Sequence, residues 1–221
     1  MNKERIIQFI RERQNLFAAI IFSIFYFVGF LGHIFKVTRP YMLAMTPYFL
    51  VIFGILAILP VLREKSRGVL FWAAGTMMVT FFLESLGTKT GLVFGAYTYG
   101  RTLGVSLLEV PPVIAFNWLL VVIGSIILSS FITKKAFFTA LFAGAFAVLF
   151  DFVMEPIAIT FSYWWWHGEV IPLQNYIAWF LIAFASALVF GLMKLDVKSR
   201  IPMIYVLVQF AFFIGLRLTV V

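Results

Sequence analysis

The sequence predicts an all-α, polytopic membrane protein with about seven transmembrane helices. The chain has 221 residues, of which 63% are hydrophobic and 12% are charged, and its mean hydropathy is +1.06. A soluble domain of this size needs many more polar residues to cover its surface. No internal repeat, low-complexity tract or soluble domain is evident, so residues 1–221 are expected to form a single integral membrane domain.

Seven apolar stretches supply the expected spans, and most approach the ~20 residues that a helix needs to cross a bilayer. The first is too long for a signal-peptide core and lacks a small-residue cleavage site, so we expect it to be a span. The seven are Leu16–Phe35, Tyr41–Leu62, Val69–Ser85, Val105–Ser129, Ala136–Glu155, Leu173–Met193 and Pro202–Val220.

Residues 1–15 are expected to form a short interfacial helix ahead of a helix bundle that comprises residues 16–221. Between Glu4 and Asn15, four apolar side chains stand against basic ones, a pattern typical of helices that lie on a membrane surface.

The basic residues predict the orientation of the chain in a cell membrane. Twelve of the 17 Lys and Arg lie before the first span or in the connections after the second, fourth and sixth spans. The positive-inside rule therefore places the N-terminus in the cytoplasm and, with seven spans, the C-terminus outside. This distribution also accounts for the net charge of +8, so no nucleic-acid partner is expected.

The sequence contains no Cys and only two His, at positions 33 and 167. It therefore excludes disulfides, thiolate catalysis and Cys-ligated metals, and it leaves few ligands for a transition metal. We expect neither a metal nor a cofactor.

Four carboxylates lie within or beside apolar stretches, all near the outer ends of the expected spans: Glu84, Glu109, Asp151 and Glu155. Charged groups at membrane depth are costly and usually mark a site for protons, ions or substrate. The alternative is that each is solvated at a helix end, since side chains there can reach the interface.

Asp151 and Glu155 stand four residues apart, so on a helix they share one face. Two close carboxylates repel each other when both are ionised, and such a pair can hold the proton that a general acid needs. We expect Pro156 to let the chain leave the helix here. Alternatively, the pair caps neighbouring helices or binds Lys89 and Arg101 in the outer loop.

Glu84 and Thr88 have the same spacing, and a glycine-rich loop follows them with Tyr97 and Tyr99. Their alternation predicts an extended segment with both rings on one side. Beside Glu84 this loop could cover a cavity, although interfacial Tyr and turn Gly are also common in membrane proteins.

The loop after the fifth span contains three consecutive Trp, of which Trp164 and Trp166 are candidates for a binding site. They fit an interfacial aromatic belt or a pocket that stabilises a carbocation by cation–π attraction. The other candidate binding residues are Asn117, Trp118, Asn175 and Trp179. The two Asn side chains have amide groups that need hydrogen-bond partners within lipid.

From about the third to the sixth span, the chain resembles the membrane hydratases of carotenoid biosynthesis, which include carotenoid 1,2-hydratases and bisanhydrobacterioruberin hydratases. The order and placement of several motifs agree. They are Glu84…Gly87-Thr88, Gly95-Ala96-Tyr97-Thr98-Tyr99-Gly100, Val110-Pro111, Asn117-Trp118, Asp151…Glu155-Pro156, Trp164-Trp165-Trp166 and Pro172-Leu173-Gln174-Asn175…Trp179. Glu109, where Gly is expected, and the missing Gly in Glu169-Val170-Ile171 depart from the pattern.

The resemblance implies addition of water to the terminal C-1,2 double bond of an acyclic carotenoid end, such as that of lycopene, gamma-carotene or a C50 analogue, to give a tertiary alcohol. Asp151 or Glu155 would donate the proton and Glu84 would hold the water, with the Tyr and Trp rings as walls for the cation. Other carotenoid enzymes are conceivable partners.

Several rival functions share some of these features. A carotenoid cyclase begins with the same protonation, whereas a polyprenyl transferase needs a second acidic motif and basic residues for diphosphate. A non-catalytic pigment carrier or a proton-coupled transporter could use the carboxylates as a relay.

Overall fold

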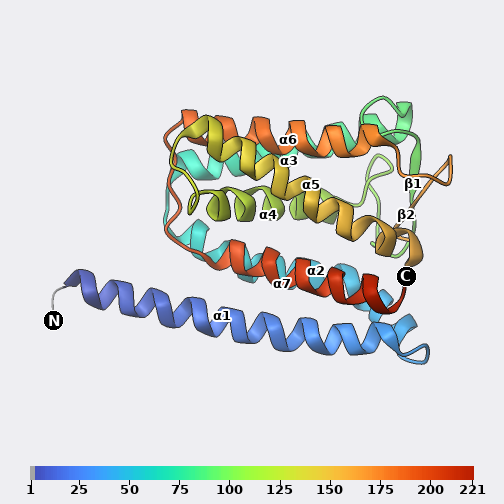
Figure 1. Ribbon diagram of the computed structural model, residues 1–221, viewed down its shortest axis with the longest axis horizontal. Helices are drawn as coiled ribbons and strands as arrows, with labels where there is room; N and C mark the ends of the chain where they lie inside the picture. Colours follow the sequence, from blue (N-terminus) through green and yellow to red (C-terminus); the bar gives the residue numbers. More distant parts are fainter. Residues whose placement is uncertain (1–2) are drawn as a thin grey trace.

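The computed structural model describes residues 3–221 and consists of seven helices and two short strands (Figure 1). The helices are α1 (Lys3–Ile34), α2 (Arg39–Arg63), α3 (Arg67–Thr90), α4 (Pro112–Ser129), α5 (Ala136–Thr160), α6 (Leu173–Leu192) and α7 (Ile201–Thr219). The strands are β1 (Tyr97–Tyr99) and β2 (Trp164–Trp166).

All seven helices are long and apolar enough to span a bilayer, so the predicted fold class, a multi-pass helical bundle, is confirmed. They alternate in direction, so the connections rich in Lys and Arg lie at one end of the bundle and both strands at the other (Figure 1). The central helix is α4, with 72% of its apolar window buried.

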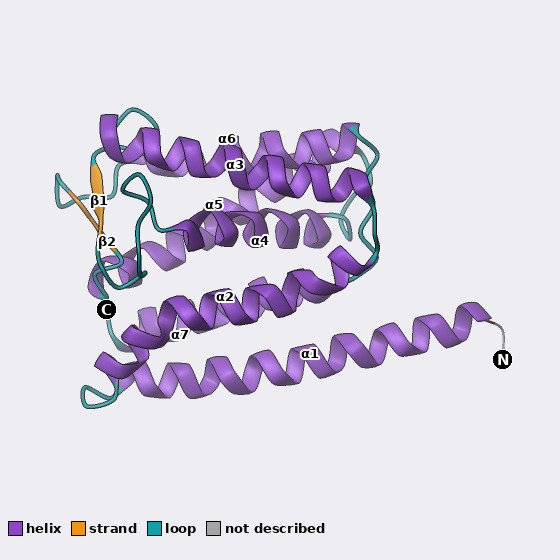
Figure 2. Cartoon of the chain, turned by 180° about the vertical axis from the view of Figure 1, so that it is seen from behind, coloured by secondary structure: helices purple, strands orange, loops and turns teal. Residues whose placement is uncertain are grey.

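The expected boundary near Asn15 is absent, because Lys3–Ile34 form one continuous helix. No break separates residues 3–15 from the first span, residues 1–2 lie outside the described part of the chain, and the interfacial position of this segment stays a prediction. No Gly or Pro stands between Glu12 and Phe17 to interrupt the helix, and a straight α1 runs along one side of the bundle (Figure 2).

The predicted start of the fourth span, at Val105, was wrong. Instead of helix, Leu107 and Val110 form an isolated bridge around a turn in which Glu109 has φ 70°. The helix begins only at Pro112, because a residue before proline avoids the helical region and Pro111 is therefore extended. Glu109 is exposed in this turn and is not among the buried acids.

Pro156 does not end α5, contrary to our expectation, since the helix continues to Thr160. A proline within a helix leaves the carbonyl four residues earlier without its N–H donor. That carbonyl belongs to Phe152, and Arg217 of α7 donates to it at 2.6 Å. The guanidinium also lies 4.6 Å from the centre of the Phe152 ring. Arg217 therefore replaces the missing donor and keeps α5 helical past the carboxylate pair.

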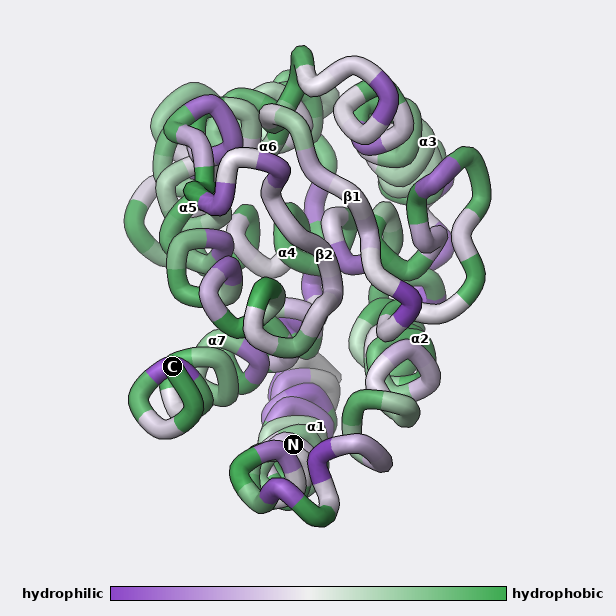
Figure 3. Tube along the Cα trace, turned by 90° about the vertical axis from the view of Figure 1, so that its right-hand side faces the viewer, coloured by the Kyte–Doolittle hydropathy of each residue, from purple (hydrophilic) through white to green (hydrophobic). Residues whose placement is uncertain are grey.

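The two strands pair antiparallel across the end of the bundle, in front of α4 (Figure 3). Gly100 follows β1 at a point where the chains approach closely, since a Cβ there would lie 2.0 Å from the carbonyl oxygen of Ser162. A side chain at this position would therefore separate the strands.

Candidate active site

Three of the four predicted carboxylates are buried, and they lie at the strand end of the bundle. Glu84, on α3, is 4% exposed, while Asp151 and Glu155, on α5, are 0% and 1% exposed. Their hydrogen-bond partners are neutral phenols, indoles and an amide. The alternative partners Lys89 and Arg101 are exposed.

Glu84 accepts three hydrogen bonds. The hydroxyl groups of Tyr97 and Tyr99 both donate to its Oε2, the latter at 2.7 Å. The indole nitrogen of Trp118 donates to Oε1 at 2.7 Å. Both tyrosines reach the same carboxylate because alternate residues of β1 face the same side, as the sequence predicted. Three short hydrogen bonds, none of them shared with a second carboxyl group, suit a carboxylate anion.

Glu155 is held by the other strand in the same way. The indole nitrogens of Trp164 and Trp166 donate to its Oε2 at 3.1 and 3.0 Å, whereas Trp165 is 47% exposed. The register pairs Tyr97 with Trp166 and Tyr99 with Trp164. One face of this two-stranded ribbon therefore supplies donors to both Glu84 and Glu155.

Asp151 is linked to Glu155 through the side-chain amide of Asn175 on α6. The amide nitrogen donates to Asp151 Oδ2 at 2.6 Å and to Glu155 Oε1 at 3.3 Å. Asp151 Oδ1 has no hydrogen-bond partner within the described part of the chain. A buried carboxylate anion with so few donors is costly, so the pair is suited to share a proton.

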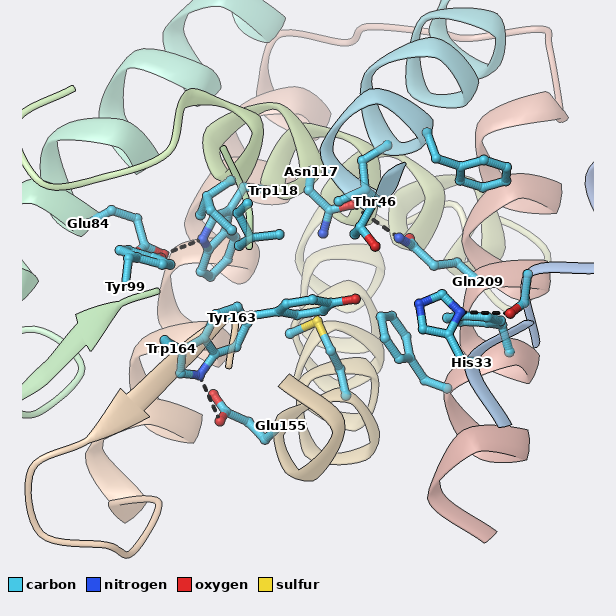
Figure 4. Close-up of a pocket in the computed structure, with 18 of the residues that line it drawn as sticks. His33, Thr46, Glu84, Tyr99, Asn117, Trp118, Glu155, Tyr163, Trp164 and Gln209 are labelled. Atoms are coloured by element: carbon cyan, nitrogen blue, oxygen red, sulfur yellow. Dashed lines mark hydrogen bonds between the residues drawn. The ribbon is translucent and has the colours of Figure 1, made fainter. Parts of the chain in front are cut away.

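A cavity of about 120 Å³ opens beside these groups (Figure 4). Of the predicted site residues, ten line it: Glu84, Tyr97, Tyr99, Asn117, Trp118, Glu155, Trp164, Trp166, Asn175 and Trp179. Asp151 and Thr88 do not line the cavity, and the Thr88 hydroxyl group donates to the Ser85 carbonyl at 3.1 Å. The rings of Trp118 and Trp179 stack at 3.7 Å.

The outer helices add lining residues that the sequence did not indicate. They include His33 of α1, Thr46 of α2, Tyr163 after α5 and Gln209 of α7. His33 and Gln209 are single polar residues in apolar stretches, and that isolation was the only sign of them in the sequence. Phe25 and Met45 also line the cavity, yet they are 46% and 53% exposed. The wall between α1 and α2 is therefore thin.

The tyrosines outside the helices stay protonated over a wide pH range. Burial, reinforced by the charge of Glu84, raises the pKa of Tyr97 and of Tyr99. Burial also raises the pKa of Tyr163 to about 12. The phenols that face Glu84 therefore act as hydrogen-bond donors at any physiological pH.

The arrangement suits proton transfer and carbocation chemistry. A carboxyl group faces an aromatic cavity, and indole and phenol rings can stabilise a positive charge through their faces. Among the described residues, no group of three His, Asp or Glu side chains is placed to hold a metal ion.

Comparison with known proteins identifies the family of the chain. The family model described as "Carotenoid biosynthesis protein" matches residues 45–221, which include every carboxylate and strand of the site. The chain belongs to this carotenoid biosynthesis family. It is also 29% identical, over 169 residues, to the bisanhydrobacterioruberin hydratase of Haloarcula japonica. The matched region covers 68% of this chain and 56% of that relative. No solved structure matches.

Membership in the carotenoid biosynthesis family confirms the resemblance drawn from the motifs. The first 44 residues lie outside the family match, although α1 contributes His33 and Phe25 to the cavity.

Proposed function

We propose that the protein is a carotenoid hydratase that adds water to the terminal C-1,2 double bond of an acyclic carotenoid end and forms a tertiary alcohol. The observation that carries this proposal is the position of Glu155. Its carboxyl group lines an aromatic cavity and is backed by a second carboxyl group, Asp151, through Asn175. The name of the Haloarcula relative, a hydratase, supports the same reaction class.

Glu155 is the proton donor in this proposal. Its proton is transferred to C-2 of the alkene, the π bond breaks, and a tertiary cation forms at C-1. The oxygen of a water molecule then bonds to C-1, and the resulting oxonium gives one proton back to a carboxylate. The net change is one water added, so no oxidant, reductant or cofactor is consumed.

Asp151 is a positioning residue in this scheme, because it does not line the cavity. It shares the Asn175 amide with Glu155 and stabilises the protonated form of Glu155 through the repulsion between two close carboxylates. Asn175 keeps both groups in place.

Glu84 stabilises the cation and the oxonium that forms when water bonds to C-1. Its three donors hold a negative charge in the cavity wall without neutralising it. The rings of Tyr97, Tyr99, Trp164 and Trp166 complete the walls around the positive centre.

The substrate enters from the lipid in this proposal, between α1 and α2. Phe25 and Met45 line the cavity and are also exposed on the outer surface of the bundle. A polyene dissolved in the bilayer could insert one end by displacing these two side chains, of which Met is especially flexible. The positive-inside rule puts this opening in the outer half of the membrane, with a cytoplasmic N-terminus and an external C-terminus.

Product mass tests the proposal against its enzymatic rivals. The gene is expressed in bacteria that accumulate lycopene or gamma-carotene, and the pigments are analysed by mass spectrometry. A hydratase adds the mass of one water for each end that reacts, whereas a cyclase changes retention without changing mass. Unchanged pigments from both strains, with the protein present in the membrane, would contradict the proposal and favour a carrier or transporter.

A further inference from the structure

A second group of polar side chains lies in the same cavity, across from the carboxylates (Figure 4). It consists of His33 from the last turn of α1, Gln209 from the middle of α7, and the hydroxyl group of Thr46 from α2. Neither the carboxylate chemistry nor the family match at residues 45–221 gives His33 a role.

His33 presents an unused hydrogen-bond acceptor to the cavity. Its Nδ1 lies 2.7 Å from the carbonyl oxygen of Gly29, so Nδ1 carries the hydrogen. In the neutral ring, Nε2 is then an acceptor. This atom is buried and has no partner among the residues that the structure describes. The ring itself is 6% exposed and packs against Phe161 and Phe212.

Gln209 presents a second unused acceptor. Its amide nitrogen donates to Asn117 Oδ1 at 3.4 Å, while its own Oε1 is buried and lacks a donor in the described region. Phe212, which touches the His33 ring at a centroid distance of 5.6 Å, lies about one turn beyond Gln209 on the same helix. Both side chains line the cavity, and Figure 4 shows them on the same side of it. Buried polar atoms without a partner are rare and usually indicate a bound water or ligand.

We propose that His33 and Gln209 form a binding site for the water that captures the carbocation, a role that rests on the proposed hydratase function. The chemistry required is an O–H donor, which either water or the tertiary alcohol of the product supplies. Water fits better because it donates two hydrogens, one for each acceptor, whereas a tertiary alcohol donates one. Water also accepts, so it satisfies the Gln209 amide in either orientation.

Such a site has a direct consequence for the products. A tertiary cation either gains water or loses a proton to become an alkene again. The rest of this wall consists mainly of aromatic and Met side chains, together with the hydroxyl groups of Tyr26 and Thr46. Holding one water within the cavity favours capture over proton loss.

The test compares His33→Leu and Gln209→Leu with the wild-type protein, reconstituted in liposomes with an acyclic carotene in D₂O. Both the water adduct and the deuterium in recovered alkene are measured. We expect the ratio of adduct to deuterated alkene to fall about tenfold in each variant, equivalent to about 1.4 kcal/mol. His33→Gln, which keeps a polar group, should retain more of the adduct. If the Leu variants fail to fold, Gln209→Met removes the amide oxygen with a side chain of similar length, and its ratio should fall in the same way.

Tyr205→Phe is the matched control. It removes a buried hydroxyl group that also lacks a partner in the described chain and lies one turn before Gln209, but outside the cavity lining. Its product ratio should equal that of the wild type.

The outcomes separate this inference from the proposed function. A wild-type protein that incorporates neither water nor deuterium would overturn the hydratase function. A wild-type protein that hydrates, with unchanged ratios in the variants, would overturn the water site alone. Unchanged ratios together with weaker inhibition by added product would assign the site to the product hydroxyl group and also overturn the water assignment.

Discussion

Replacement of Glu155 by Gln removes the proposed proton but preserves the shape of the side chain. The substituted side chain would place an amide nitrogen where one carboxylate oxygen now lies. If that nitrogen faces Asn175, two donors meet; if Asn175 turns, Asp151 loses the hydrogen bond from the Asn175 amide. Either arrangement loses one buried hydrogen bond and costs about 1–3 kcal/mol of stability.

The effect on turnover should be larger than the effect on stability. Removal of a general acid typically slows a reaction by roughly 10²–10⁴-fold, or about 3–5 kcal/mol in the barrier. Asp151→Asn should also reduce turnover, but less, because Asp151 does not line the cavity. Turnover is measured as water adduct formed by reconstituted protein, with folding checked by thermal unfolding and circular dichroism.

Deuterium uptake separates the roles of the acids. In D₂O, Glu155→Gln should incorporate no deuterium into recovered alkene, whereas Glu84→Gln should still incorporate it while forming less alcohol. Glu109→Gln is the control, since that acid is exposed in a turn, and it should behave as the wild type. Hydration near the wild-type rate by a folded Glu155→Gln variant would refute the assignment of Glu155 as the acid.

Topology reporters, chelation and the contact between α5 and α7 offer three further tests. Reporters fused after Arg67 and Lys135 should read cytoplasmic and those within residues 88–103 external, from the distribution of basic residues; a cytoplasmic reading from the latter would invert the site. Activity should be insensitive to EDTA. Loss of activity on chelation, followed by its restoration with a divalent ion, would favour a transferase. Arg217→Met should lower the unfolding temperature more than Arg101→Met does, because it leaves the Phe152 carbonyl without a donor. The loss of that hydrogen bond should cost about 1–3 kcal/mol of stability. Equal unfolding temperatures for the two variants would show that this contact is not stabilising.

Hydrophobicity was sufficient to predict the seven spans, because the cost of exposing polar groups to lipid dominates at this scale. Local pattern was sufficient for the ribbon, since alternation along a strand decides which rings face the same side. Thus Tyr97 and Tyr99 were correctly expected to lie together, and Trp164 and Trp166 proved to share the same face.

Features that depend on contacts between distant helices could not be predicted in this way. Pro156 suggested a helix end, and only the donor from Arg217, 61 positions later, explains why the helix continues. Glu109 lies in an apolar stretch of the sequence, which suggested a helix within the membrane. It belongs instead to a turn before Pro111 and Pro112, where the helix begins. The contribution of His33 and Gln209 to the cavity depends on how α1 and α7 pack in the bundle, and the sequence pattern of each helix alone does not predict that packing.

The ribbon of β1 and β2 couples the hydrogen-bond donors of Glu84 to those of Glu155. β1 carries the phenols that hold Glu84, β2 carries the indoles that hold Glu155, and the strands are hydrogen-bonded to one another. A shift in one strand is therefore transmitted to the donors of the other acid. Substitutions at Tyr99 and Trp166, although directed at different carboxylates, should then be non-additive in a double-mutant cycle, and the acid and the anion would function as one adjustable unit.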